Sequence, residues 1–301
     1  MEYDVGVLGC GAVGSLVASA LAAGGRRVAV FCLRQRRAAE IARGGIRLRG
    51  DGLDSLARVD AYHAGRLQAV KVGHLVVAVR AWDAVGLDRG RLRADTVTYV
   101  QPTVKLERLL AEPGAGLLAL YACASETGEG VSYAPGVAAA AGGDAGEAAE
   151  ALGRLGFRVR RYPEGDRVRL LWDYAAAHAS VQPVAALLGV PLSSVARLKH
   201  GRALVESLAR EAMLVMERRG VKPLRSPVDA AYELLGVRGC YPRMLQDLEA
   251  GRRTEVEYMN AAIAAEALRS DVYAAYNDTM YLLVKAREEL AEELGLQVDS
   301  R

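Results

Sequence analysis

The 301-residue chain contains few lysines, few cysteines and no long apolar run. Only five lysines stand against 34 arginines, which leaves few side chains for a catalytic ammonium group. The four cysteines lack the paired spacing of a zinc site, so the sequence predicts no metal centre. No apolar stretch approaches the ~20 residues that a membrane helix needs. These absences favour a protein without a structural metal or a membrane span.

The balance of charge excludes a polyanion as an obvious partner. The formal net charge is +3 at pH 7, and no recognised nucleic-acid motif is present. The sequence therefore predicts no nucleic-acid and no membrane partner. Met1 leads almost directly into a predicted strand, which leaves no room for a signal peptide. We expect a cytoplasmic protein.

A G-x-G-x-x-G motif near the start of the chain is formed by Gly9, Gly11 and Gly14. It lies between a short apolar run and an alanine-rich stretch, the strand–turn–helix order of a dinucleotide-binding unit. Gly9 would permit the tight turn, Gly11 the approach of a pyrophosphate, and Gly14 close packing of helix and strand. Backbone N–H groups at the helix start, including Ala12 and Val13, would bind the phosphates. We predict dinucleotide binding.

The end of the second predicted strand indicates which dinucleotide is bound. An NAD site usually has an acidic residue here, but none occurs between Asp4 and Glu40. Arg34, Arg36 and Arg37 stand there instead. A guanidinium group binds a 2′-phosphate, so the sequence favours NADP, with Arg34 as the principal ligand. The alternative is a solvated basic loop in an arginine-rich chain.

Two cysteines fall on this same unit. Cys10 lies within the glycine motif and Cys32 near the end of the neighbouring strand, which places them close together. We expect two buried free thiols. A disulfide is the alternative, and it is favoured if the source is a hyperthermophile.

Strands and helices alternate in the first half, whereas the second half shows only helical periodicity. The sequence predicts an α/β fold, with an N-terminal Rossmann-type doubly wound parallel sheet and an all-helical C-terminal domain. We expect an NADP-binding domain over residues 1–165 and a helical substrate-binding domain over residues 166–301. Predicted strands are 28–33, 74–79, 96–100 and 117–122, with a hairpin at 127–136 and a helix at 142–155. Predicted helices of the second half are 170–188, 194–219, 226–235, 254–268 and 273–294.

Two segments of the second half carry a more specific pattern. Residues 244–247 read Met-Leu-Gln-Asp, and residues 253–260 read Arg-Thr-Glu-Val-Glu-Tyr-Met-Asn. With these two segments, the whole chain resembles the ketopantoate reductase (2-dehydropantoate 2-reductase) family. The resemblance also rests on the glycine motif, Arg80-Ala81-Trp82, Trp172, Pro183 and Asn277. The resemblance implies a Rossmann and a helical domain with substrate between them. It also implies NADPH-dependent reduction of a 2-oxo acid, foremost 2-dehydropantoate to pantoate in the coenzyme A (pantothenate) pathway. It places Arg80 at the cofactor.

The resemblance also shows where this chain departs from the family pattern. Tyr174 stands where the family has a lysine that protonates the carbonyl oxygen. His178 and Gln182 replace two substrate-holding asparagines, and Arg243 replaces a serine. Gln101-Pro102 replaces an Asn-Gly pair in a substrate loop. Glu255 is the member of the catalytic group that is retained.

Tyr174, His178 and Gln182 are spaced at successive i+4 positions and would share one face of a helix. A tyrosine hydroxyl can donate a proton to a developing alkoxide, which makes Tyr174 and His178 candidate catalytic residues and Gln182 a candidate substrate ligand. The alternative is a satisfied polar contact between helices.

Four further candidates complete the predicted site. Arg243 can form two hydrogen bonds to a substrate carboxylate, although a surface ion pair is the alternative. Lys105 follows a predicted strand and is the lysine best placed to replace the missing one; the alternative is a solvated loop residue. Gln101 and Glu255 are expected to contact substrate or orient the donor. The leading function is thus reduction of a 2-oxo acid, either 2-dehydropantoate or a different keto acid. Exposed apolar faces on the C-terminal helices would allow a homodimer. The alternative is a catalytically silent NADP-binding homologue that acts as a sensor or structural partner.

Overall fold

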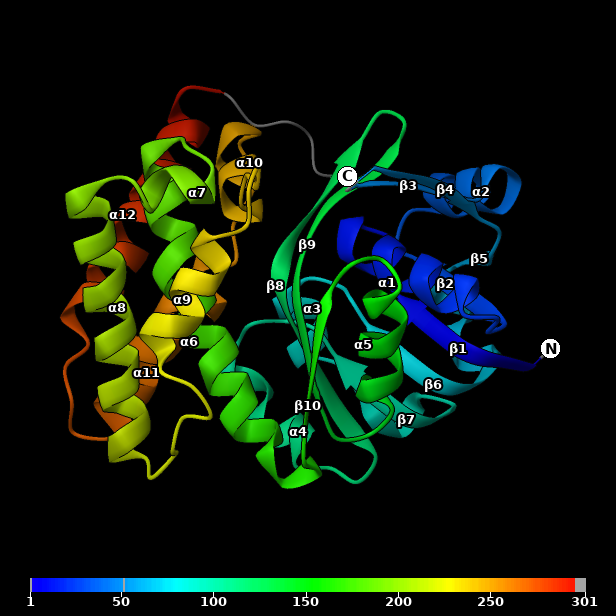
Figure 1. Cartoon of the computed structure of the whole chain (residues 1–301), viewed down its shortest axis with the longest axis horizontal. Helices are drawn as coiled ribbons and strands as arrows, with labels where there is room; N and C mark the ends of the chain where they lie inside the picture. Colours follow the sequence, from blue (N-terminus) through cyan, green and yellow to red (C-terminus); the bar gives the residue numbers. More distant parts are fainter. Residues whose placement is uncertain (1, 51, 296–301) are drawn as a thin grey trace. The chain divides into compact units, whose positions relative to one another are not determined.

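The computed structural model describes residues 2–50 and 52–295. The chain divides into two compact units (Figure 1). The first comprises Met1–Gln101 and Leu106–Arg167, and the second Pro102–Lys105 and Val168–Arg301. The short Pro102–Lys105 segment thus groups with the C-terminal half although it lies within the N-terminal half of the sequence.

The first unit is built on one mixed sheet flanked by helices. Its strand order is β4-β3-β9-β8-β7-β6-β1-β2-β5, with β10 paired to β9. The path from β5 through β2, β1, β6 and β7 to β8 is parallel, whereas the β8–β9 and β3–β4 pairs are antiparallel. The predicted α/β class is confirmed. The strands are β1 (Glu2–Leu8), β2 (Val28–Cys32), β3 (Ile46–Gly50), β4 (Leu53–Ala57), β5 (Asp60–His63), β6 (Lys71–Val77), β7 (Ala94–Tyr99), β8 (Ala115–Thr127), β9 (Gly130–Ala141) and β10 (Arg158–Tyr162). The helices are α1 (Ala12–Ala23), α2 (Gln35–Gly44), α3 (Ala81–Val85), α4 (Glu107–Leu110) and α5 (Ala145–Gly153), with short 3₁₀ turns η1 (Ala64–Ala69), η2 (Arg89–Arg91) and η4 (Glu164–Asp166).

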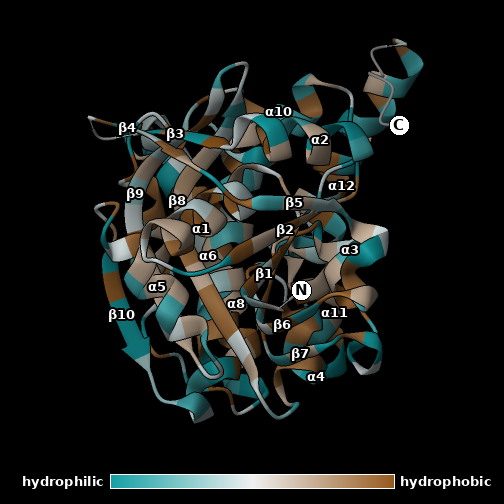
Figure 2. Cartoon of the chain, turned by 90° about the vertical axis from the view of Figure 1, so that its right-hand side faces the viewer, coloured by the Kyte–Doolittle hydropathy of each residue, from teal (hydrophilic) through white to brown (hydrophobic). Residues whose placement is uncertain are grey.

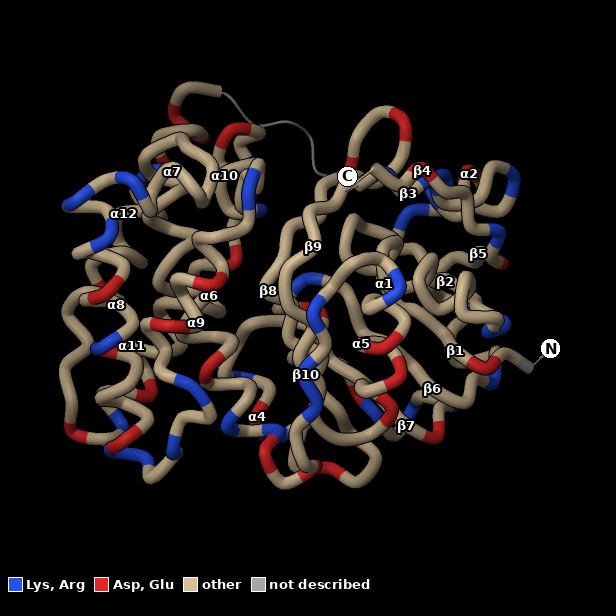
Figure 3. Tube along the Cα trace, in the orientation of Figure 1, with Lys and Arg blue, Asp and Glu red and all other residues tan. Residues whose placement is uncertain are grey.

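Burial explains which strands the sequence reveals. Every residue of β2 is buried, as expected for a parallel strand covered on both faces. In Figure 2, β6 carries mostly hydrophobic colour, whereas β10 is largely hydrophilic. The sequence RVRRY of β10 carries three arginines, and Figure 3 shows the basic positions along it. That strand has no apolar run to mark it, and it was not predicted.

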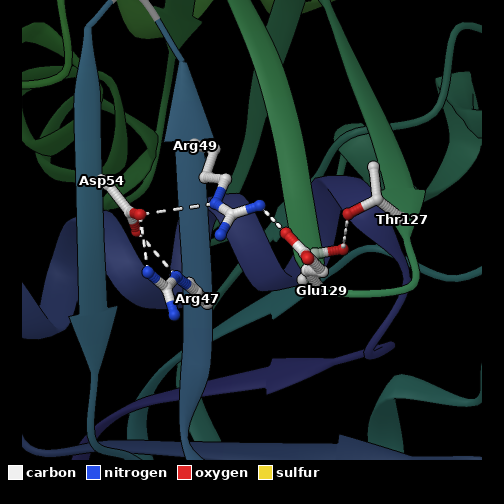
Figure 4. Close-up of polar contacts among 6 residues, drawn as sticks. Arg47, Arg49, Asp54, Thr127 and Glu129 are labelled. Carbon is white, nitrogen blue, oxygen red and sulfur yellow. Dashed lines mark hydrogen bonds and ion pairs between the residues drawn. The ribbon is translucent and has the colours of Figure 1, made fainter.

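Charged side chains join the β3–β4 hairpin to the β8–β9 turn (Figure 4). Arg47 binds both carboxylate oxygens of Asp54, at 2.8 and 2.6 Å. Arg49 pairs with Asp54 and with Glu129 at the turn. The Arg47 guanidinium group lowers the pKa of Asp54 below its usual range. Thr127 closes the same turn through its hydroxyl, which donates to the Gly130 carbonyl. These arginines therefore stabilise the edge of the sheet.

The second unit is helical, and no strand follows Tyr162 among the described residues. Gly220 has a φ of +69°, and its N–H donates to the Glu217 carbonyl, which confirms it as the glycine that ends a helix. The predicted 194–219 helix is interrupted, because the extended backbone of Leu198 separates α7 from α8. The 7-residue α10 was not predicted. The helices are α6 (Arg167–Leu188), α7 (Leu192–Val195), α8 (Lys199–Arg218), α9 (Pro227–Leu235), α10 (Arg243–Glu249), α11 (Asn260–Arg269) and α12 (Ala275–Glu293), with η5 (Val256–Tyr258); η3 (Val104–Leu106) spans the unit boundary.

Helix α6 forms the centre of the second unit. Trp172, Ala176 and Ala179 pack in one core cluster with residues such as Met216 and Ile263. A helix buried on all sides shows no amphipathic stripe, which is the case for α6. Within residues 2–50 and 52–295, no helix combines the length and apolar character that a membrane crossing requires.

Asp173 fixes α6 to the loop before α9. Its Oδ2 accepts the backbone N–H groups of Leu224 and Arg225, both at 3.0 Å. The carboxyl is 1% exposed, and burial raises its pKa to about 7, against the opposing effect of those two donors. Asp173 therefore keeps its proton in the folded chain at mildly acidic pH.

This raised pKa predicts a pH-dependent stability. Between its ordinary value of 3.8 and about 7, the folded state holds a proton that the unfolded state has lost. The free energy of unfolding contributed by Asp173 should therefore fall as pH rises, by on the order of 1.4 kcal/mol per pH unit, and level off above pH 7. Asp173→Asn keeps an acceptor for both N–H groups and cannot ionise. Urea unfolding from pH 4 to 8.5 should show the variant gaining stability relative to wild type across that window. Parallel curves would contradict the assignment.

Candidate functional site

The glycine turn after β1 has the geometry of a dinucleotide loop. Gly9 has a φ of +109°, and a Cβ there would overlap the Ala78 carbonyl oxygen. A Cβ on Gly14 would overlap the Gly9 carbonyl oxygen, so helix α1 approaches the turn as closely as glycine allows. A Cβ on Gly11 meets no described atom within 4 Å. Gly9 and Gly14 are thus required by packing, while Gly11 faces open space.

Helix α1 begins directly at this open space. Its first backbone hydrogen bond runs from the Ser15 N–H to the Gly11 carbonyl, at 2.9 Å. The N–H groups of Ala12, Val13 and Gly14 precede it and have no carbonyl partner within the helix. The first turn contains no acidic side chain that would compete for them. Such a helix start binds phosphate groups, so these residues fit the pyrophosphate of a dinucleotide.

Cys10 and Cys32 form a disulfide, so the expectation of two free thiols is wrong. The register of the parallel β1–β2 pair aligns Leu8 with Phe31, and the Gly9 N–H donates to the Phe31 carbonyl. This alignment brings the two cysteine Cα atoms to 5.1 Å, within disulfide range. The bond ties the glycine turn to the end of β2.

Arg34 follows that disulfide and precedes α2. Its neighbours Arg36 and Arg37 both pair with Glu40. The side chain of Arg34 is exposed, and no acidic partner for it occurs in the part of the chain that the structure describes. Arg34 is therefore the guanidinium group of this cluster that remains available to an anion. The strand β5 places His63 beside Cys32 at the same edge, a neighbour that sequence reasoning missed.

Arg80 and Gln101 follow the ends of strands β6 and β7. Arg80 precedes α3, and its guanidinium group stacks on the Trp82 ring at 5.4 Å. Gln101 is buried, and its amide nitrogen donates to the Val77 and Val79 carbonyls at 3.0 and 2.8 Å. Its amide oxygen accepts the Val100 N–H. Gln101 therefore holds the ends of β6 and β7 together, with both amide hydrogens engaged.

The predicted polar stripe exists on α6. The Tyr174 and His178 rings meet edge to face, with centroids 4.6 Å apart. Gln182 Nε2 lies 2.7 Å from His178 Nδ1. Tyr174 and His178 are buried, and Gln182 is partly exposed. If the amide donates, Nδ1 is the acceptor, and a neutral His178 carries its proton on Nε2. The stripe can thus present a hydroxyl and an imidazole N–H side by side.

Glu255 lies between α10 and α11, at the start of η5. The residue before it is held firmly: the Thr254 hydroxyl donates to Glu288 Oε1 at 2.6 Å, and its N–H donates to the same oxygen at 2.8 Å. Glu288 belongs to α12 and also pairs with Lys285. Sequence reasoning missed Glu288, because one acid among the charges of a helix gives no signal. It positions the segment that carries Glu255.

Lys105 and Arg243 also belong to the second unit. The Lys105 ammonium group lies 4.3 Å from the centroid of the Tyr258 ring, next to the Glu255 segment. Arg243 Nε donates to Asp247 Oδ1 at 3.3 Å, and Arg252 binds the same oxygen at 3.0 Å. Among the described residues, the terminal nitrogens of Arg243 have no partner. They can bind a carboxylate.

Two family profiles match the chain. The profile described as "Ketopantoate reductase PanE/ApbA" matches residues 5–94, and "Ketopantoate reductase PanE/ApbA C terminal" matches residues 167–288. The chain belongs to the ketopantoate reductase family.

Relatives and solved structures agree with this family. The chain is similar to a 2-dehydropantoate 2-reductase of Archaeoglobus fulgidus, with 28% identity over 94% of this chain and 97% of that protein. A PanE/ApbA family ketopantoate reductase from Ralstonia eutropha has a similar fold, with a TM-score of 0.78, 21% identity, and 97% and 100% of the chains covered. A D-mandelate dehydrogenase bound to NADH and anilino(oxo)acetate gives a TM-score of 0.79 at 18% identity, covering 97% and 99%. The ketopantoate reductase fold therefore extends over 97% of the chain.

The candidate site residues of this ketopantoate reductase homologue fall into two sets, one in each unit. The glycine turn, Arg34, Arg80 and Gln101 belong to the first unit. The α6 stripe, Lys105, Arg243 and Glu255 belong to the second. No group of three or more metal-ligating side chains occurs within the described ranges.

Proposed function

We propose that this protein reduces a small 2-oxo acid with NADPH, and that 2-dehydropantoate is its substrate. The first unit would bind the cofactor and the second would supply the groups that act on the substrate. The observation that carries the proposal is the glycine turn, in which Gly11 faces open space at the start of α1. A family of 2-oxo acid reductases and a relative at 28% identity support the substrate.

The residues of the first unit fit a dinucleotide. The N–H groups of Ala12, Val13 and Gly14 would hold the pyrophosphate, and Arg34 the ribose 2′-phosphate. Arg80, stacked on Trp82, would face the cofactor from the end of β6. NADPH, when bound, supplies the hydride.

The second unit would then manage the substrate's charges and proton. Reduction turns the carbonyl oxygen into an alkoxide, which requires a proton donor. Tyr174 would donate from its hydroxyl, while His178, fixed through Nδ1 by Gln182, would hold the tyrosine ring and stabilise the developing negative charge through its Nε2–H. Arg243 would bind the carboxylate through its terminal nitrogens. Glu255 and Lys105 would orient substrate and donor. Gln101 would act by holding β6 and β7.

The test is NADPH oxidation with 2-dehydropantoate and with phenylglyoxylate, the oxidised form of mandelate, while NADPH binding is titrated in parallel. Turnover of 2-dehydropantoate supports the proposal. Preference for phenylglyoxylate keeps the reaction and replaces the substrate. Tight NADPH binding with no turnover of either acid would favour the catalytically silent alternative, and no binding would refute the cofactor assignment.

The choice of NADPH over NADH should depend on Arg34. Arg34→Ala is expected to weaken NADPH binding by about 10- to 100-fold, because a charge-assisted hydrogen bond contributes roughly 1.5–3 kcal/mol. NADH, which lacks the 2′-phosphate, should lose little. Arg36→Ala is the matched control, since that side chain is 92% exposed and pairs with Glu40. Fluorescence titration with both cofactors measures the effect. Equal losses for NADPH and NADH would argue against 2′-phosphate recognition.

A further inference from the structure

Pro183 interrupts the hydrogen bonding of α6 beside the polar stripe. Proline has no N–H, so the carbonyl four residues earlier loses its helical donor. That carbonyl belongs to Ala179, the residue after His178. The affected turn is thus the one spanned by the Gln182–His178 contact.

Asn260 replaces the missing donor. Its Nδ2 lies 2.9 Å from the Ala179 carbonyl oxygen, and its second hydrogen goes to Asn277 Oδ1 at 3.0 Å. The Asn260 side chain is fully buried, so it has no access to water as an alternative partner. A buried carbonyl left without a donor lowers the free energy of unfolding by about 1–3 kcal/mol. The hydrogen bond from Asn260, which takes the place of the missing backbone N–H, therefore matters for stability.

A chain of hydrogen bonds holds Asn260 in place. Asn277 Nδ2 donates to Glu211 Oε2 at 2.7 Å. The backbone N–H groups of Tyr276 and Asn277 donate to the Glu211 carboxylate at 2.9 and 2.8 Å. The open turn of α6 is therefore tied through α11 and α12 to α8. A network with both amide donors engaged fixes one orientation.

We propose that Asn260 is a positioning residue, which sets the α6 turn at Pro183 and thereby the direction of His178 and Gln182. This inference rests on the proposed function, in which the stripe acts on the substrate. Asn260 acts through the backbone and does not touch the reacting atoms. Its effect follows from geometry, because small displacements of catalytic groups lower rates strongly.

The test is a double-mutant cycle with Pro183→Ala, which restores an N–H that can donate to Ala179. In the wild-type background, Asn260→Leu should lower kcat by about 10- to 100-fold and leave the Kd for NADPH unchanged. In the Pro183→Ala background, the same substitution should cost less than about threefold. Ser180→Ala is the control, because its hydroxyl bonds the Ala176 carbonyl on the same helix without touching Ala179. Equal losses in both backgrounds would show that Asn260 only fills space, and would overturn the proposal.

A second readout separates this inference from the proposed function. The ¹⁵N resonances of the His178 ring report its tautomer and need no substrate. Asn260→Leu should shift them, and Pro183→Ala should restore them, even if wild type turns over neither 2-oxo acid. Unshifted resonances in a folded Asn260→Leu protein would refute the positioning role, whether or not the enzyme is active. Circular dichroism and thermal melting establish that each variant is folded.

Discussion

Tyr174→Phe is expected to lower kcat for 2-oxo acid reduction by about 10²- to 10⁴-fold, the usual contribution of a positioned proton donor. The substitution removes only the hydroxyl, so the edge-to-face contact with His178 should persist. KM for the acid and the Kd for NADPH should change little, because neither binding step needs that proton. Steady-state kinetics with a parallel NADPH titration measures both quantities.

Two controls make this result decisive. Tyr276→Phe removes a hydroxyl from a tyrosine that is half exposed on α12, and it should leave kcat unchanged. Lys105→Met tests the other candidate donor, whose ammonium group lies over the Tyr258 ring. If Lys105→Met abolishes turnover and Tyr174→Phe does not, the proton comes from the lysine and the assignment of Tyr174 is wrong.

Removal of the Cys10–Cys32 disulfide should have the second large effect. The bond closes a loop with a sequence separation of 22 residues. Loss of such a cross-link lowers the free energy of unfolding by about 3 kcal/mol. NADPH binding should weaken as well, since the bond joins the glycine turn to the strand that leads to Arg34. Cys10→Ala/Cys32→Ala tests both effects by urea unfolding and cofactor titration.

The control for that experiment is Ser15→Ala in the protein that retains the Cys10–Cys32 disulfide. The Ser15 hydroxyl donates to the Cys10 carbonyl at 3.3 Å, so this variant perturbs the same turn without cutting the cross-link. It should cost well under half of the stability that the double cysteine variant loses, because a single hydrogen bond contributes about 1 kcal/mol. A double cysteine variant as stable as wild type would show that the bond adds nothing to the folded chain.

The elements that the sequence revealed are those in which burial and periodicity agree. The β2 segment is apolar throughout, and the glycine motif follows an apolar strand and precedes an alanine-rich helix, so both were predictable. The β10 segment contains three arginines and no apolar run, and its pairing with β9 depends on tertiary contacts that no local pattern records. The break at Leu198 lies inside one continuous helical pattern of apolar residues. Periodicity alone therefore predicted a single helix across it.

The candidate site likewise contains features that the sequence predicts and features that depend on contacts between distant residues. Three arginines near the end of β2 look alike in the sequence, and only the pairing of Arg36 and Arg37 with Glu40 singles out Arg34. Two cysteines predicted to be close could not be known to be bonded before the β1–β2 register fixed their separation. The roles of Gln101 and Asn260 depend on partners distant in sequence, such as Val77 and Ala179.

The Cys10–Cys32 bond also determines how the protein should be handled. A chain produced in a reducing bacterial cytosol would first carry two thiols, one at the glycine turn and one at the end of β2. Purification in buffers rich in thiol reagents would keep it in that form. Preparations that differ only in their exposure to air would then differ in cofactor affinity. Thiol titration of each preparation therefore belongs beside every binding curve.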